Sequence, residues 1–157
     1  MFGGLIAHTY LVALAVATLV ALVWTVALVV WDVREQRLPN ALTLSAAAVA
    51  VTVCFFYPTG WWGLLWPGMF VAVALAAPNT NPGIRTHAGI GGGDIKLAVS
   101  LGVAAALAGG VMGVLGAMLL SSAITVFVLL MAGQSGMAHG PSMLIAAWLV
   151  VIACALA

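Results

Sequence analysis

The chain has 157 residues, of which 66% are hydrophobic and only 4% are charged. Roughly a quarter of the residues in a soluble domain are charged, so a soluble fold could not cover its surface here, and we expect the lipid bilayer to be the solvent. The formal net charge of +1 comes from four basic residues, too few for a phosphate-binding patch, which excludes nucleic acid as a partner.

Apolar segments fill the chain without a long polar interruption, which predicts an all-α fold with one membrane-embedded domain over residues 1–157. A spanning helix needs about 20 apolar residues, and the first such segment covers about 5–31. No Lys or Arg precedes Arg34, so this segment does not resemble a cleavable signal peptide. A turn-forming Tyr-Pro-Thr-Gly stretch separates the second segment, at about 41–56, from the third, which ends near Ala77.

The remaining apolar run, 96–131, is too long for one helix, and Gly109-Gly110 could divide it. A break there leaves only about twelve apolar residues before it, which at about 1.5 Å per residue is short of the hydrocarbon thickness. We therefore expect a later turn, near Gly113 or Gly116, combined with a helix that starts below the membrane surface. A last span over about 141–157 brings the expected number of transmembrane helices to six.

Six spans place the polar loops 32–40, 78–95 and 132–140 on one face of the membrane. All four basic residues lie in these loops or directly beside them, and so do all three acidic residues. The positive-inside rule makes this face cytoplasmic and both termini external. We therefore predict a multi-pass protein of the plasma (inner) membrane with its polar chemistry on the cytoplasmic side.

Two carboxylates, Asp32 and Asp94, each lie where a span meets this face. If they meet in space they can share one proton, because like charges about 3 Å apart resist double ionisation, and such a pair can act as acid and base. The alternative is two solvated loop acids that balance nearby basic residues. Gly91 and Gly93 beside Asp94 would let a substrate backbone approach closely, although a plain flexible loop would have the same glycines.

Two other classes of function remain open. Asp32, Asp94, His87 and His139 share the polar face and could bind a divalent cation in a small metal or ion transporter. No ionisable group lies in the middle of a span to form a transmembrane path, which argues against transport. A catalytically silent assembly factor is the other alternative. A carboxylate pair requires no metal and no cofactor, and we predict neither.

Three short motifs resemble those of the type IV prepilin peptidases. Asp32 is followed by Leu-Pro-Asn at 38–40, which is similar to the first motif of that family. Residues 91–96 read Gly-Gly-Gly-Asp-Ile-Lys and resemble its Gly-x-Gly-Asp-x-Lys motif. Gly140-Pro141 is similar to the Gly-Pro of its third segment. The resemblance extends from about residue 31 to the end of the chain, and the short form looks like the peptidases of tight-adherence (Flp-type) pilus systems.

The resemblance implies that Asp32 and Asp94 are the catalytic pair of an intramembrane aspartic endopeptidase. Its substrate would be a prepilin-like membrane protein whose basic leader is cut at the cytoplasmic face. Gly91, Gly93, Lys96, Gly140 and Pro141 would support the site or bind substrate. The larger members carry two CxxC pairs that this chain lacks, and many of them also methylate the new N-terminus, so we expect no methyltransferase activity.

Three of the surrounding residues are interpreted separately. Lys96 could bias the pair toward one negative charge, or could be an anchor that follows the positive-inside rule. Asn40 could cap the second span, with Pro39 beside it in the first turn. His139 stands where an apolar or aromatic residue is more usual in the family.

Overall fold

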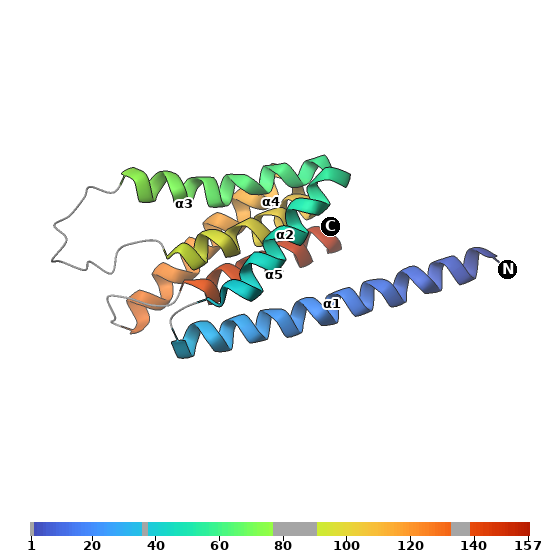
Figure 1. Ribbon diagram of the computed structural model, residues 1–157, viewed down its shortest axis with the longest axis horizontal. Coiled ribbons are helices and arrows are strands. Elements are labelled where there is room, and N and C mark those ends of the chain that lie inside the picture. The colour runs from blue at the N-terminus through green and yellow to red at the C-terminus, as the bar shows by residue number, and fades with distance from the viewer. Residues whose placement is uncertain (1, 36–37, 77–90, 133–138) are drawn as a thin grey trace.

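The structure is a computed structural model that describes residues 2–35, 38–76, 91–132 and 139–157. These residues form helices and no strand. In chain order the helices are α1 (Phe2–Glu35), α2 (Asn40–Phe56), the 3₁₀ helix η1 (Pro58–Leu64), α3 (Leu65–Ala76), α4 (Gly92–Ala132) and α5 (Gly140–Leu156). Figure 1 shows them as a bundle in which α1 lies along one side. The predicted all-α class is confirmed.

Length and apolar composition indicate a membrane protein. Three described helical stretches are long and apolar enough to cross a bilayer, namely Leu11–Glu35, Pro58–Ala76 and Gly92–Ala132. The helices α2 and α5 are also apolar but shorter. Large apolar side chains are exposed over much of the surface, as lipid contact requires.

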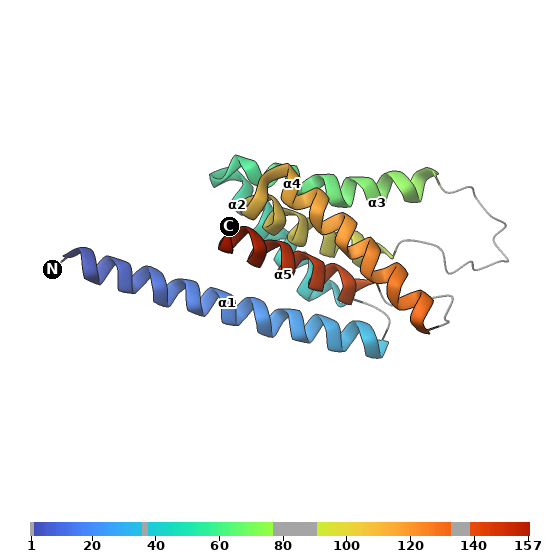
Figure 2. The same cartoon turned by 180° about the vertical axis from the view of Figure 1, so that it is seen from behind.

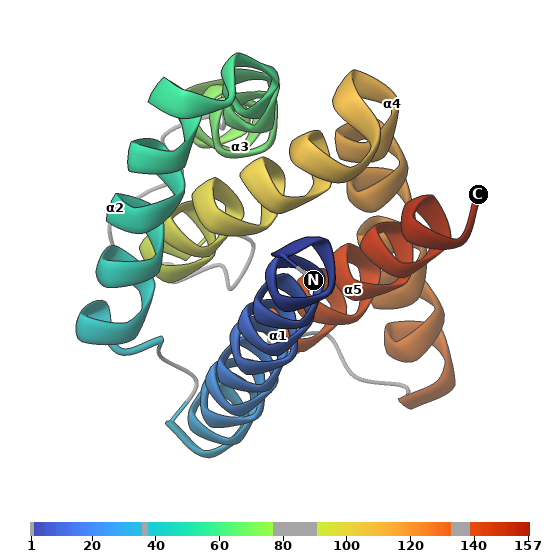
Figure 3. The same cartoon turned by 90° about the vertical axis from the view of Figure 1, so that its right-hand side faces the viewer.

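Helix α4 contains a sharp break, and its position corrects the expectation of a later turn. Gly109 and Gly110 have non-helical backbone angles, and Gly110 has a φ of 59°, in the left-handed region that favours glycine. Gly113 instead lies within the second half of α4, where a Cβ atom would collide with the carbonyl oxygen of Ala105. Figures 2 and 3 show the chain turning at the break, so that the second half runs back beside α5.

With η1 and α3 counted as one stretch, Pro58–Ala76, the break in α4 gives six helical segments among the described residues, in the order expected for the six spans. The first half of α4 is also longer than expected, because the helix already begins at Gly92. Four additional residues therefore precede the apolar run. These residues lengthen the first half of α4, so a turn later than Gly109-Gly110 is not needed to reach across the membrane.

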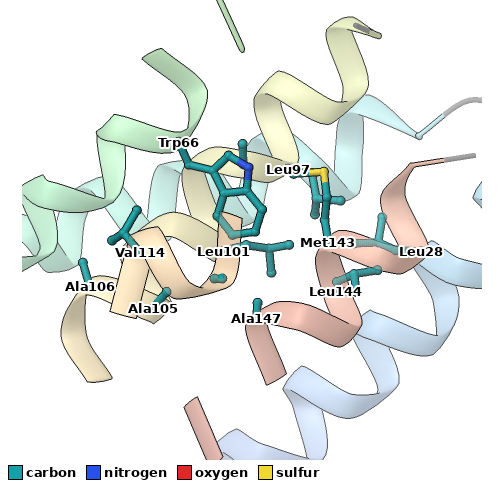
Figure 4. Packing of buried hydrophobic residues seen from close by; sticks show 12 residues of the cluster. Leu28, Trp66, Leu97, Leu101, Ala105, Ala106, Val114, Met143, Leu144 and Ala147 are labelled. Atoms are coloured by element: carbon teal, nitrogen blue, oxygen red, sulfur yellow. The ribbon is translucent and has the colours of Figure 1, made fainter. Parts of the chain in front are cut away.

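The core is centred on α4, which packs against α5, η1, α2 and α3. Figure 4 shows Trp66 of α3 lying among small and branched side chains of α4 and α5. Gly63 of η1 and Gly102 of α4 cross so closely that a Cβ atom on either would collide with backbone of the other. Such close approach of small residues is a common way to pack helices in membranes, where burial of apolar surface gives no driving force.

Candidate functional site

Asp32 is carried into the bundle by the buried stripe of α1. Leu28, one helical turn earlier, is completely buried in the core, and residues four apart lie on the same face of a helix. Asp32 is accordingly only 5% exposed although it belongs to the last turn of α1. Its Oδ2 atom is buried and has no hydrogen bond of good geometry among the described residues. A buried carboxylate oxygen without a partner is costly and points to a functional role.

Asp94 lies in the first turn of α4 and is half-buried. The chain is tightly turned here, since the amides of Asp94 and Ile95 both donate to the carbonyl of Gly91, at 3.0 and 3.3 Å. The Gly91 backbone also forms a hydrogen bond with the Asp94 side chain. The start of a helix favours a negative charge on Asp94, whereas the partial burial of its side chain opposes that charge.

The two aspartates are brought together at one end of the bundle. Their carboxyl groups are close enough to interact electrostatically. Leu38 of the first motif lies beside the segments that carry the other two motifs: a Cβ atom on Gly93 would be 3.0 Å from the Leu38 Cβ, and one on Gly140 would be 3.8 Å from its Cδ1. The three motifs found in the sequence therefore converge on one site, formed by the end of α1, the start of α4 and the start of α5 (Figure 1).

Gly140 and Pro141 have separate structural roles at this site. Gly140 is buried, and a Cβ atom there would collide with Oδ2 of Asp32. The backbone amide of Gly140 also lies close enough to the Asp32 carboxylate to favour its charged form. Pro141 occupies the first turn of α5, where a missing N–H costs nothing. The pair thus starts α5 directly against Asp32, which only a residue without a side chain permits.

The three consecutive glycines before Asp94 differ in their surroundings. A side chain on Gly93 would press on Leu38, and one on Gly91 would come within 3.3 Å of Asp94 Oδ2. A side chain on Gly92 would meet nothing within 4 Å. The motif Gly-x-Gly-Asp is therefore explained residue by residue, since the variable position is the open one. At Gly93, the group that approaches closely in the structure is the side chain of Leu38 and not a substrate backbone.

Lys96 joins the second motif to the first. Its ammonium group donates a hydrogen bond to the Asn40 side-chain oxygen, over 2.7 Å. The expectation that Asn40 caps α2 is wrong, because Pro39 occupies the N-cap and no side chain caps the helix. Asn40 instead accepts from Lys96, a pairing between residues 56 positions apart that no local pattern could reveal.

The sequence singled out His139 but missed its two partners. Thr125 of α4 and Ser142 of α5 have hydroxyl oxygens 2.8 and 3.3 Å from His139 Nδ1, and these hydroxyls lie 2.7 Å apart. Burial lowers the pKa of His139, and the charge of nearby Asp32 partly opposes this effect. The available signal was that a Thr and a Ser occur in apolar segments, where polar groups usually pair across helices.

Other predicted positions add less. Within the described ranges, no three His, Cys, Asp or Glu side chains gather as metal ligands, and His87 of the proposed cation site lies outside those ranges. Cys54 is buried and Cys154 partly buried, and both are free thiols. Glu35 is exposed at the end of α1, away from the buried stripe that carries Asp32.

Comparison with known proteins bears on what this site does. The model of the type IV leader peptidase family matches residues 19–130, a segment that includes Asp32 and Asp94 but ends before Gly140. Comparisons with curated proteins and with solved structures gave no match. The match covers most of the chain. The chain therefore belongs to the type IV leader peptidase family and is a protease of the membrane-embedded kind that its apolar helices require.

Proposed function

We propose that the chain is an intramembrane aspartic endopeptidase that removes the leader from a prepilin-like membrane protein. The observation that carries the proposal is that Asp32 and Asp94, on different helices, lie close enough for their charges to interact. The unpartnered Oδ2 of Asp32 supports it, since this oxygen is free to act on a substrate or a water molecule. Membership of the family supports protease activity, and the two neighbouring carboxylates support an aspartic mechanism.

The surroundings of the two carboxylates suit different roles in the reaction. Asp94 at the start of α4 suits the ionised partner, which takes a proton from water as the water oxygen attacks the scissile carbonyl carbon. Asp32, in its buried position, suits the protonated partner, which gives its proton to the carbonyl oxygen. The proton held by Asp94 then passes to the leaving nitrogen as the carbon–nitrogen bond breaks, and a hydroxyl of the tetrahedral intermediate returns a proton to Asp32 as the carbonyl forms again.

The proposed location follows from charge. The end of α1 and the starts of α4 and α5 lie at one end of the bundle, and the basic residues of the chain cluster in sequence around these points. By the positive-inside rule this end faces the cytoplasm. The enzyme would then be a multi-pass protein of the inner membrane, with lipid around its apolar exterior and the substrate leader entering from the cytoplasmic side.

The test uses purified protein in detergent and a prepilin-like precursor with a basic leader, with a chelator present. Asp32→Asn and Asp94→Asn should each lower cleavage by about 100-fold or more, because asparagine cannot take up or release the proton. The double variant should be little worse than either single one, since the two residues act as a unit. The parent should show a bell-shaped pH–rate curve that belongs to the pair.

Glu35→Gln is the matched control, because Glu35 lies on the same helix, is exposed and stands outside the pair. It should change the rate only modestly. Substantial cleavage by either single asparagine variant would refute the aspartic mechanism. Loss of parental activity in chelator would favour the metal alternative, and a folded parent that cleaves no precursor would favour the silent assembly factor.

A further inference from the structure

His139 is held at the centre of a small polar cluster between three helices. Its Nδ1 atom lies 2.8 Å from the Thr125 hydroxyl of α4, and its carbonyl oxygen accepts from the Ser142 hydroxyl of α5 at 2.7 Å. Phe70 of α3 packs against the imidazole, with 5.9 Å between ring centroids. The ring is thus fixed in position, although His139 lies just before the first residue of α5.

Counting protons assigns the tautomer. Each hydroxyl has one proton to give. Ser142 donates to the His139 carbonyl at 2.7 Å, and the Thr125 hydroxyl has two acceptors in reach, the Ser142 hydroxyl at 2.7 Å and the Ser121 carbonyl at 2.9 Å. With the Thr125 proton on either acceptor, Nδ1–H donates to Thr125. This tautomer supplies a proton to more of these contacts than one in which Thr125 donates to Nδ1, and it leaves Nε2 as the nitrogen that gains or loses a proton.

The backbone directly after His139 touches Asp32. A Cβ atom on Gly140 would collide with Asp32 Oδ2, which places His139 one residue from the buried carboxylate. The charges of His139 and Asp32 act on each other. Thr125, Ser142 and Phe70, which also contact the ring in the described part of the chain, carry no charge. A proton on His139 therefore acts chiefly on Asp32.

We propose that His139 is a positioning residue that, by taking up a proton beside Asp32, preserves the single negative charge of the aspartate pair as the pH falls. The inference rests on the proposed function, in which Asp32 and Asp94 are the reacting pair. The pair loses activity in acid when its one negative charge is neutralised. A cationic imidazole beside Asp32 opposes that neutralisation and so extends activity to lower pH.

The sign of the effect follows from the pKa of His139, which burial lowers. At alkaline pH the imidazole is neutral and has little effect on the pair. As the pH falls through the range where His139 titrates, the cation appears and stabilises the ionised form of the pair. Removing the imidazole should therefore shift the acidic limb of the pH–rate curve upward and leave the alkaline limb in place.

The first experiment measures pH–rate curves for His139→Gln, His139→Phe and Thr125→Val. Glutamine can still donate to Thr125 but cannot become charged, whereas phenylalanine can do neither. Both should move the acidic limb upward by about 0.5–1 pH unit, an ordinary shift for loss of one nearby charge. Thr125→Val keeps the imidazole, so its acidic limb should stay within a few tenths of a unit of the parental one while the rate falls. Unchanged limbs in both His139 variants would overturn the proposal and leave His139 a packing residue.

The second experiment does not depend on cleavage. NMR of protein with ¹⁵N-labelled histidine follows the titration of His139, whose signals are identified by their loss in His139→Gln. Asp32→Asn should lower the titration midpoint of His139, because it removes the negative charge that favours the imidazolium. Glu35→Gln, on the same helix but exposed, should leave the midpoint unchanged. Equal midpoints in the parent and in Asp32→Asn would overturn the proposal, whereas a parent that cleaves no precursor but shows this coupling would overturn only the proposed function.

Discussion

The two catalytic candidates stand on regions of very different support. Asp94 belongs to α4, which packs against α2, η1, α3 and α5. Two core residues of this helix, Leu97 and Ala105, are completely buried. Asp32 belongs to α1, which packs mainly against α5 and exposes large apolar side chains such as Leu19, at 62%. Figures 1 and 2 show α1 extending well beyond the other helices at its N-terminal end.

Two hydrogen bonds between helices hold α1, and their residues on α1 lie about two helical turns before Asp32. The Trp24 indole donates to the carbonyl of Leu42 in α2 at 3.2 Å, and the Trp148 indole of α5 donates to the Thr25 hydroxyl at 3.0 Å. In a bilayer, lipid tails cover apolar surface as well as protein does, so such hydrogen bonds and close packing set helix positions. Half of the site therefore belongs to a well-packed framework, whereas the other half is positioned by a few directional contacts.

The largest effect on this arrangement is expected from Gly140→Ala, at the point where α5 touches Asp32. The added methyl group would collide with Asp32 Oδ2 and displace it from Asp94. Because a displacement of about 1 Å can cost about 100-fold in rate, we expect a loss of that order in precursor cleavage, measured on protein that is still folded.

Gly92→Ala is the matched control for Gly140→Ala, since its methyl group would meet nothing within 4 Å although it lies inside the Gly-x-Gly-Asp motif. It should retain most of the activity, and alanine also favours the helix that begins there. If the two variants lost equal activity, the contact between Gly140 and Asp32 would not be what positions the carboxylate.

An intermediate effect is expected when α1 is loosened by Trp148→Phe or Thr25→Val. Each removes the same interhelical hydrogen bond, of about 0.6–1.7 kcal/mol in a membrane, which corresponds to a loss of roughly three- to eighteenfold if it is expressed in the rate. The double variant should match the single ones, because they share one bond. Trp62→Phe, at an exposed tryptophan of η1, is the control. Additive losses in the double variant would show that the two residues act separately.

The smallest effect is expected from breaking the hydrogen bond between Lys96 of α4 and Asn40 of α2. This hydrogen bond is exposed, so Lys96→Met and Asn40→Ala should each lower cleavage only about two- to threefold. Both should leave the limbs of the pH–rate curve in place, and Lys96→Arg, which can still donate to Asn40, should retain more activity than Lys96→Met. A pH shift in Lys96→Met that is absent from Asn40→Ala would show that the Lys96 charge tunes the aspartate pair.

Much of the fold was predictable because the chemistry of membranes restricts it strongly. A chain this apolar must form helices, and Asp32 and Asp94 had to lie at helix ends because charge is costly at greater depth. The glycines before Asp94 and the Gly-Pro before the last helix were also visible as motifs. The division of the long apolar run was foreseen, but its place at Gly109-Gly110 depended on a helix start at Gly92 that the apolar pattern did not mark.

The partners of the polar side chains were decided by the tertiary structure alone. A membrane helix is apolar on every side, so no periodic pattern indicates which face meets which neighbour. Lys96 therefore reaches Asn40, and His139 reaches Thr125, across distances in sequence that no local rule spans. The contact of Gly140 with Asp32 has the same origin, because only the packing of α5 against α1 brings a backbone with no side chain against the buried carboxylate.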